Sequence, residues 1–127
     1  MIQLIAPDQI NAVWRDAVTW LEPAIKRSGG RYTVPTVYDA IKRGDMQLWT
    51  VGDAYCTTEV ACYPALTVLC INHLGGRNMG RWIHEIAHIE EWGRSQGCER
   101  VEIVGRAGWA MALPGYSKAG YITEKKL

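Results

Sequence analysis

The sequence contains no phenylalanine, no CxxC pair, no run of like charges and no apolar stretch long enough to cross a bilayer. Without close cysteine spacing, a metal or redox cluster is not expected, and the four cysteines are predicted to be buried free thiols. They are Cys56, Cys62, Cys70 and Cys98. The net charge of +1 gives no bulk attraction to nucleic acid or to an anionic membrane. The start lacks the basic end and long apolar run of a signal peptide, so a cytoplasmic location is expected.

The chain has 127 residues, and it shows neither an internal repeat nor a low-complexity segment. This length fits one domain with enough core to fold alone, so residues 1–127 are predicted to form a single domain. Tryptophan and tyrosine, six of each, must supply the aromatic part of that core because phenylalanine is absent.

A helix is predicted between Met79 and a terminating glycine, Gly97. Apolar residues recur there at steps of three and four, which places them on one face. They are Met79, Trp82, Ile83, Ile86, Ile89 and Gly93, whereas Arg81, His84, His88, Glu91 and Ser95 fall on the opposite face. Glu90 falls inside the apolar stripe, and the sequence offers no reason for it.

Other segments predict an alternation of helices and strands. Residues 2–5 form a first strand, Asp8 is a candidate N-cap for a helix over 10–21, and Pro23 should kink or restart that helix. Thr33 or Thr36 should cap a second helix that ends at Gly44. Strands are expected at 46–51, 54–63, 65–74, 100–104 and 121–126, with a helix or loop at 107–113.

This order predicts the architecture of the sheet. The three successive strands from 46 to 74 indicate an antiparallel meander, and the strand–helix–strand unit that follows indicates a parallel neighbour. The strand at 65–74 is apolar almost throughout, which favours an interior position. We therefore expect an α/β (α+β) fold with a mixed, mostly antiparallel sheet and helices on both faces.

The turn before the predicted helix is suited to binding an anion. Gly75, Gly76 and Gly80 let the backbone approach a ligand closely, and Arg77 and Arg81 add positive charge. A helix start also carries unpaired N–H groups and a partial positive charge. The alternative is that these glycines only form a tight strand-to-helix turn.

Three local motifs resemble the GNAT N-acetyltransferase superfamily. Arg77-x-x-Gly80-x-Trp82 after an apolar strand is similar to the family's pyrophosphate loop. The run 90–94 followed by Gly97-Cys98 and a strand resembles the family's helix end and next strand, and 116–121 is similar to its Tyr-x-x-x-Gly-Phe. The chain also resembles small phage-encoded members of that superfamily. Two positions depart from the pattern: Trp82 replaces a usual Gly or Ala, and Gly108-Trp109 stands where an Asn is frequent.

The resemblance implies an N-acyltransferase fold and acetyl-CoA as the co-substrate. The pantetheine arm would pair with the backbone of Ile71, Asn72, His73 and Leu74, and the pyrophosphate would lie at Arg77, Asn78, Met79, Gly80, Arg81 and Trp82. Tyr116 would protonate the departing thiolate, unless it is only a half-buried packing residue. The acceptor would be a small-molecule or peptide amine bound near the N-terminal helices and 29–35, and the chain could act as a homodimer.

The amine must lose a proton, and Glu59, among Tyr, Thr and Cys on its strand, is the candidate base, with His73 second. A solvent-facing strand carboxylate is the alternative interpretation of Glu59. The fold could also serve a non-catalytic binding or assembly module with a tryptophan-rich partner surface.

A zinc hydrolase is the less favoured alternative. His84-Glu85-x-x-His88 has the spacing that places two imidazoles on one side of a helix. However, Glu91 and Arg94 occupy positions where the extended zinc motif has a glycine and a third ligand. We therefore expect these histidines to lie on a solvated helix face and to bind no metal.

Overall fold

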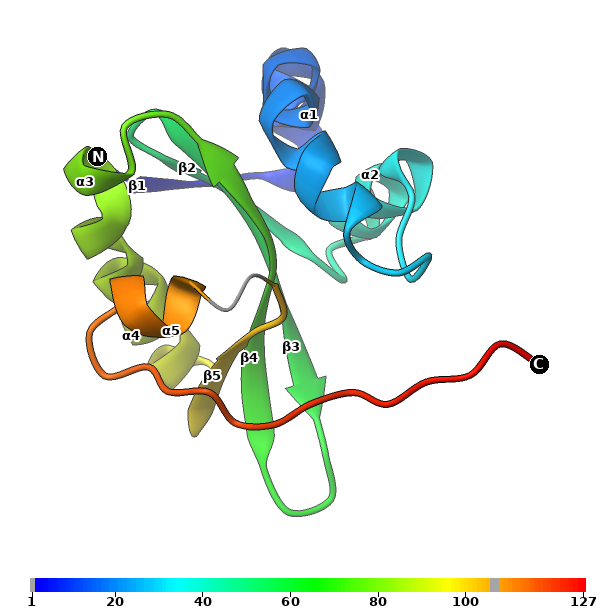
Figure 1. The fold of residues 1–127 in the computed structure, drawn as a ribbon. Coiled ribbons are helices and arrows are strands. Elements are labelled where there is room, and N and C mark those ends of the chain that lie inside the picture. Colours follow the sequence, from blue (N-terminus) through cyan, green and yellow to red (C-terminus); the bar gives the residue numbers. More distant parts are fainter. Residues whose placement is uncertain (1, 106–107) are drawn as a thin grey trace.

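The computed structural model describes residues 2–105 and 108–127. Its sheet has five strands in the order β1-β2-β3-β4-β5 (Figure 1). They are β1 Ile2–Ile5, β2 Gln47–Val51, β3 Ala54–Cys62, β4 Thr67–Gly76 and β5 Arg100–Ile103. The pairs from β1 to β4 are antiparallel, and β5 is parallel to β4, which has a neighbour on both sides. The predicted mixed sheet, with 65–74 in an interior position, is confirmed.

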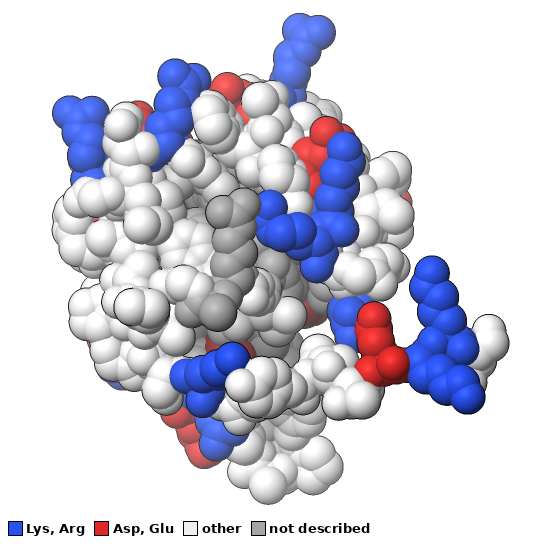
Figure 2. Space-filling model, viewed as in Figure 1, with Lys and Arg blue, Asp and Glu red and all other residues white. Residues whose placement is uncertain are grey.

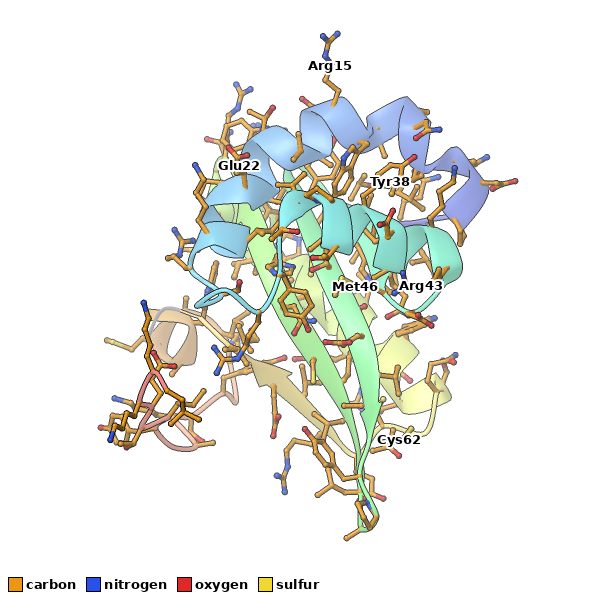
Figure 3. The ribbon with its side chains drawn as sticks, turned by 90° about the vertical axis from the view of Figure 1, so that its right-hand side faces the viewer. Arg15, Glu22, Tyr38, Arg43, Met46 and Cys62 are labelled. Carbon is orange, nitrogen blue, oxygen red and sulfur yellow. The ribbon has the colours of Figure 1, made fainter. Side chains whose placement is uncertain are left out.

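Two helices, α1 (Ile10–Lys26) and α2 (Val34–Arg43), cover one face of the sheet. Their apolar residues form a core cluster with Leu48 of β2. The buried members from the helices are Ile10, Ala17, Leu21, Ile25, Val37 and Ile41. In the direct view of this side, the two helices lie over part of the sheet and leave the end of the β3–β4 hairpin near Cys62 uncovered (Figure 3).

The ends of these helices confirm some predictions and correct others. Thr33 and Thr36 bond to each other's backbone as a capping box, and Gly44 ends α2 with φ of 83°. Asp8 does not cap α1, because it lies in the short 3₁₀ helix η1 (Pro7–Gln9). Pro23 does not interrupt α1. Burial of Leu21 and Ile25 on either side of it holds the helix together despite the lost hydrogen bond.

The opposite face carries α3 (Met79–Trp82), a 3₁₀ turn η2 (Ile83–Glu85), α4 (Ile86–Ser95) and α5 (Gly108–Ala112). The predicted single helix is therefore broken after its first turn, at Ile83–Glu85. Its apolar face is confirmed at Trp82 and Ile86, together with Ile89 and Gly93, all of which are buried. Met79 departs from that face with 43% of its surface exposed.

The final strand predicted at 121–126 is wrong. Residues from Tyr116 onward form neither helix nor strand, and the chain end extends away from the helices (Figure 1). Tyr121 is 85% exposed. The strand propensity of this segment is not sufficient, because a strand is stable only when a neighbour supplies hydrogen bonds and an apolar face.

The cysteines are free, as predicted, but their burial differs. Cys56 is buried, Cys70 and Cys98 are partly buried, and Cys62 is exposed near the end of β3, where no helix covers the sheet. Prediction of buried thiols is therefore confirmed for Cys56 and wrong for Cys62. Within the described ranges, no helix has the length and apolar character needed to span a membrane.

Candidate active site

Strands β4 and β5 separate halfway along β4. Their pairing runs from Val68 with Arg100 to Ile71 with Ile103. Strand β4 then continues to Gly76, and no described strand pairs with 72–76 on that side. The N–H and C=O groups of these residues that face β5 are therefore available to an extended ligand.

A β-bulge lies where the two strands separate. Thr57 of β3 pairs with His73, whereas the next residue, Thr58, pairs with Ile71, so Asn72 is the additional residue on β4. A bulge alters the alternation of side chains along the strand. Both Asn72 and His73 consequently contact Tyr32, which lies in the loop between α1 and α2.

Glu59 of β3 is held in a polar cluster on this side of the sheet. Its Oε1 accepts hydrogen bonds from Tyr32 Oη at 2.5 Å and from Asn72 Nδ2 at 2.7 Å. Burial, and then the hydrogen bond to Glu59, raises the pKa of Tyr32 to about 12. Tyr32 therefore stays protonated and remains a donor to the carboxylate at neutral pH. Glu59 is therefore not the solvent-facing strand carboxylate of the alternative interpretation, because two side chains hydrogen-bond to it.

His73 lies deeper beside the same cluster, with 2% of its surface exposed. Its Nδ1 lies 2.6 Å from Thr57 Oγ1, and its Nε2 has no hydrogen-bond partner among the described residues. Burial lowers the pKa of His73 to about 4, so the ring is neutral at pH 7. The deep position makes His73 a poorer candidate than Glu59 for direct contact with an acceptor.

The buried imidazole predicts a pH dependence of stability. Unfolded His73 binds a proton below pH 6.5, whereas the folded protein resists protonation down to about 4. The unfolded state binds more protons in this window, so the free energy of unfolding should fall as pH decreases through it. The full loss is about 3 kcal/mol, at about 1.4 kcal/mol for each pKa unit. Urea unfolding of the protein and of His73→Asn between these pH values measures it, and equal slopes for both proteins would contradict the prediction.

Tyr116 lies on the other side of the sheet. Its hydroxyl donates to Glu90 Oε2 at 2.6 Å, and its ring packs against the core cluster that contains Ile71 and Leu74. This contact explains why Glu90 stands in the apolar stripe of α4. Burial, and then the bond to Glu90, raises the pKa of the Tyr116 phenol far above its usual value. The phenol is therefore fully protonated at neutral pH.

The loop between β4 and α3 is shaped by Trp82. Trp82 is 2% exposed, and its Nε1 donates to the Arg77 carbonyl oxygen at 2.6 Å. Asn78 adopts a left-handed conformation with φ of 54° at the start of α3. A Cβ added to Gly80 would meet no heavy atom within 4 Å. The large side chain at 82 thus lies beneath the loop, and the backbone near Gly80 remains accessible.

Arg77 of the loop lies toward α1, whereas Arg81 of α3 lies toward the turn between β2 and β3. The Arg77 guanidinium lies 4.8 Å from the centre of the Trp20 ring, and Arg81 Nη1 lies 3.8 Å from Asp53 Oδ2. Arg77, Asn78 and Asp53 line a cavity of about 300 Å³. On the face in Figure 2, basic side chains are scattered, and several of them lie beside acidic ones. This distribution agrees with the balanced charge of the sequence.

The structure does not favour the zinc alternative. His84 lies in η2 and His88 in α4, and both are exposed. No group of three or more potential metal ligands occurs in the part of the chain that the structure describes.

Several residues of the site could not be identified from the sequence. Tyr32 lies 27 positions from Glu59, and Glu90 lies 26 positions from Tyr116. Among these residues, only Glu90 could be suspected from the sequence. A carboxyl group within an apolar stripe is expected to have a hydrogen-bond partner. The bulge that turns Asn72 toward Glu59 depends on pairing with β3 and leaves no pattern in β4 itself.

No protein-family model matches the chain, and no curated protein sequence matches it significantly. Solved structures do. An aminoglycoside acetyltransferase from an uncultured soil metagenomic sample, in complex with sisomicin, matches with a TM-score of 0.72 at 10% identity, over 100% of this chain and 95% of that one. A GNAT family acetyltransferase from Staphylococcus aureus matches with a TM-score of 0.65 at 12% identity, over 100% of this chain and 98% of that one. The ribosomal-protein-alanine N-acetyltransferase of Brucella melitensis matches with a TM-score of 0.64 at 8% identity, over 98% of this chain and 99% of that one. The chain has the GNAT acetyltransferase fold.

Proposed function

We propose that this protein is an N-acyltransferase that moves the acetyl group of acetyl-CoA directly to an amine. The observation that carries the proposal is the separation of β4 from β5, with Glu59 and Tyr116 on opposite faces of the sheet beside it. A proton acceptor on one side and a proton donor on the other suit the two proton transfers of acyl transfer to an amine.

The residues around the separated strands fit acetyl-CoA. The free edge at 72–76 offers hydrogen-bonding groups to the amides of a pantetheine arm. The accessible backbone near Gly80, with Arg81 close by, suits a pyrophosphate. Acetyl-CoA supplies the activated acetyl group as a thioester. Binding along β4 would place that thioester near the bulge at Asn72.

The chain's own residues would perform the proton transfers. Glu59 accepts a proton from the acceptor amine as the amine nitrogen bonds to the acetyl carbon. Tyr116 gives its proton to the leaving sulfur. Its hydroxyl hydrogen now points to Glu90, and rotation about the C–O bond turns it toward the sulfur. The acceptor is a primary amine that enters from the side of α1, α2 and the Tyr32 loop.

Calorimetric titration with acetyl-CoA and an acetylation assay test the proposal. Sisomicin and a peptide that begins with alanine are suitable first acceptors, because the structural neighbours named above include enzymes of these two kinds. We expect one acetyl-CoA to bind per chain and at least one amine to gain an acetyl group, detected by mass spectrometry. Folded protein that shows no heat of binding at high acetyl-CoA concentration would overturn the proposal.

A further inference from the structure

The carboxylate of Glu59 is bonded through one oxygen only. Tyr32 Oη and Asn72 Nδ2 both donate to Oε1, at 2.5 and 2.7 Å. Asn72 Nδ2 also lies 3.3 Å from Tyr32 Oη, so the three side chains form a closed triangle. None of the described residues donates a hydrogen bond to Oε2 of Glu59. The triangle fixes one oxygen and leaves the other available.

Both donors are held by the surrounding fold. The Tyr32 backbone N–H donates to Ser28 Oγ at 3.1 Å, and the Tyr32 ring packs edge-on against His73 with centroids 5.1 Å apart. Asn72 occupies the β-bulge of β4, whose backbone is paired with β3 on both sides of it. Since neither donor can follow a rotating carboxylate, the bonds to Oε1 restrict the side-chain rotation of Glu59.

We propose that Tyr32 and Asn72 are positioning residues that orient Glu59 so that its free Oε2 faces the nitrogen of the acceptor amine. This inference rests on the acyltransfer function proposed above. During the reaction a proton passes from the amine nitrogen to Oε2, the N–C bond forms and the C–S bond breaks. The sulfur keeps the bonding electron pair and receives the Tyr116 proton.

Orientation of this kind affects turnover more than binding. A base displaced by about 1 Å can cost on the order of a hundredfold in rate. Tyr32→Phe removes one donor to Oε1 and leaves the ring contact with His73 in place. We expect kcat to fall about tenfold, while KM for acetyl-CoA stays unchanged because Tyr32 lies on the acceptor side of β4.

A double-mutant cycle tests the connection to Glu59. Tyr32→Phe should have no further effect on kcat in a Glu59→Gln background, since the carboxylate to be oriented is absent. The matched control is Tyr38→Phe, which also removes a short phenol hydrogen bond, 2.5 Å to Asn11 Oδ1, at a solvent-exposed position between α2 and α1. We expect this control to turn over like the unmodified protein.

A second readout distinguishes positioning from a structural role. O-methylhydroxylamine is a far weaker base than an alkylamine, so its nitrogen loses its proton more readily once it bonds to the acetyl carbon, and it depends less on a positioned carboxylate. The fall in kcat caused by Tyr32→Phe should therefore be only about twofold or less with O-methylhydroxylamine. An equal loss with both amines would assign Tyr32 a structural role and overturn the inference.

The remaining outcomes separate the inference from the function on which it rests. Suppose that the unmodified protein turns over and that Glu59→Gln lowers kcat, but that Tyr32→Phe has a normal kcat. This result would overturn the positioning role alone. Normal turnover in Glu59→Gln would remove Glu59 as the base and the positioning role with it. Absence of acetyl-CoA binding in the unmodified protein would overturn the proposed function itself.

Discussion

Replacing Tyr116 with phenylalanine should lower kcat for acetyl transfer by about a hundredfold or more, which is the range of a lost general acid. The substitution removes only the hydroxyl, and the ring can keep its contacts with the core cluster. The leaving sulfur would then depart without a proton donor, while the contacts that bind acetyl-CoA along β4 would be preserved. Steady-state kinetics and calorimetry should therefore show a large loss in kcat and an unchanged Kd for acetyl-CoA.

Two controls make this result interpretable. Phenylalanine at 116 leaves the half-buried Glu90 without its donor, which should cost about 1 kcal/mol of stability. Thermal unfolding must therefore show that Tyr116→Phe is folded at the assay temperature. Tyr121→Phe alters a tyrosine in the same terminal segment that is 85% exposed, and should leave kcat unchanged. Turnover of Tyr116→Phe within about threefold of the unmodified protein would remove Tyr116 from the role of acid.

Substitution of Gly75 with alanine should have the largest effect on stability. A Cβ at this position would lie 2.1 Å from the carbonyl oxygen of Trp20, which belongs to the backbone of α1. A backbone atom cannot turn away as a side chain can, so α1 must shift from β4. We expect the free energy of unfolding to fall by about 3 kcal/mol, the upper part of the usual cost of overpacking. Urea unfolding measures this loss.

Gly108→Ala is the matched control for that substitution. A Cβ at Gly108 would meet no heavy atom within 4 Å, and the residue lies in α5, where alanine is a better helix former. Its urea midpoint should equal or exceed that of the unmodified protein. If Gly75→Ala unfolded at the same urea concentration as Gly108→Ala, this result would contradict the close approach of α1 to β4 at Gly75.

The parts of the fold that depend on local pattern could be predicted from the sequence. Periodicity located α1, α2 and the buried face of α4, and Gly44 and Gly97 marked helix ends with positive φ. The run of apolar residues placed β4 in the sheet interior, and the intervening helix predicted that β5 would be parallel to it. Each of these features arises from neighbouring residues, so the chain segment itself carries the information.

The site depended on contacts that no segment carries alone. The sequence predicted Glu59 and Tyr116, but not the partners that hold them, Tyr32 and Glu90. Strand pairing decided two further features. The β4–β5 pair ends at Ile71, and the segment at 121–126 finds no partner and forms no strand. Propensity within a segment cannot reveal where a neighbouring strand stops.

A crystal structure of the protein with coenzyme A tests the central claim most directly. The account predicts that the pantetheine arm lies along β4 between 72 and 76, with its amides hydrogen-bonded to the strand and the pyrophosphate against the backbone near Gly80. The sulfur should then lie within reach of the Tyr116 hydroxyl. Coenzyme A bound elsewhere on the molecule, with the edge of β4 unchanged, would contradict the account.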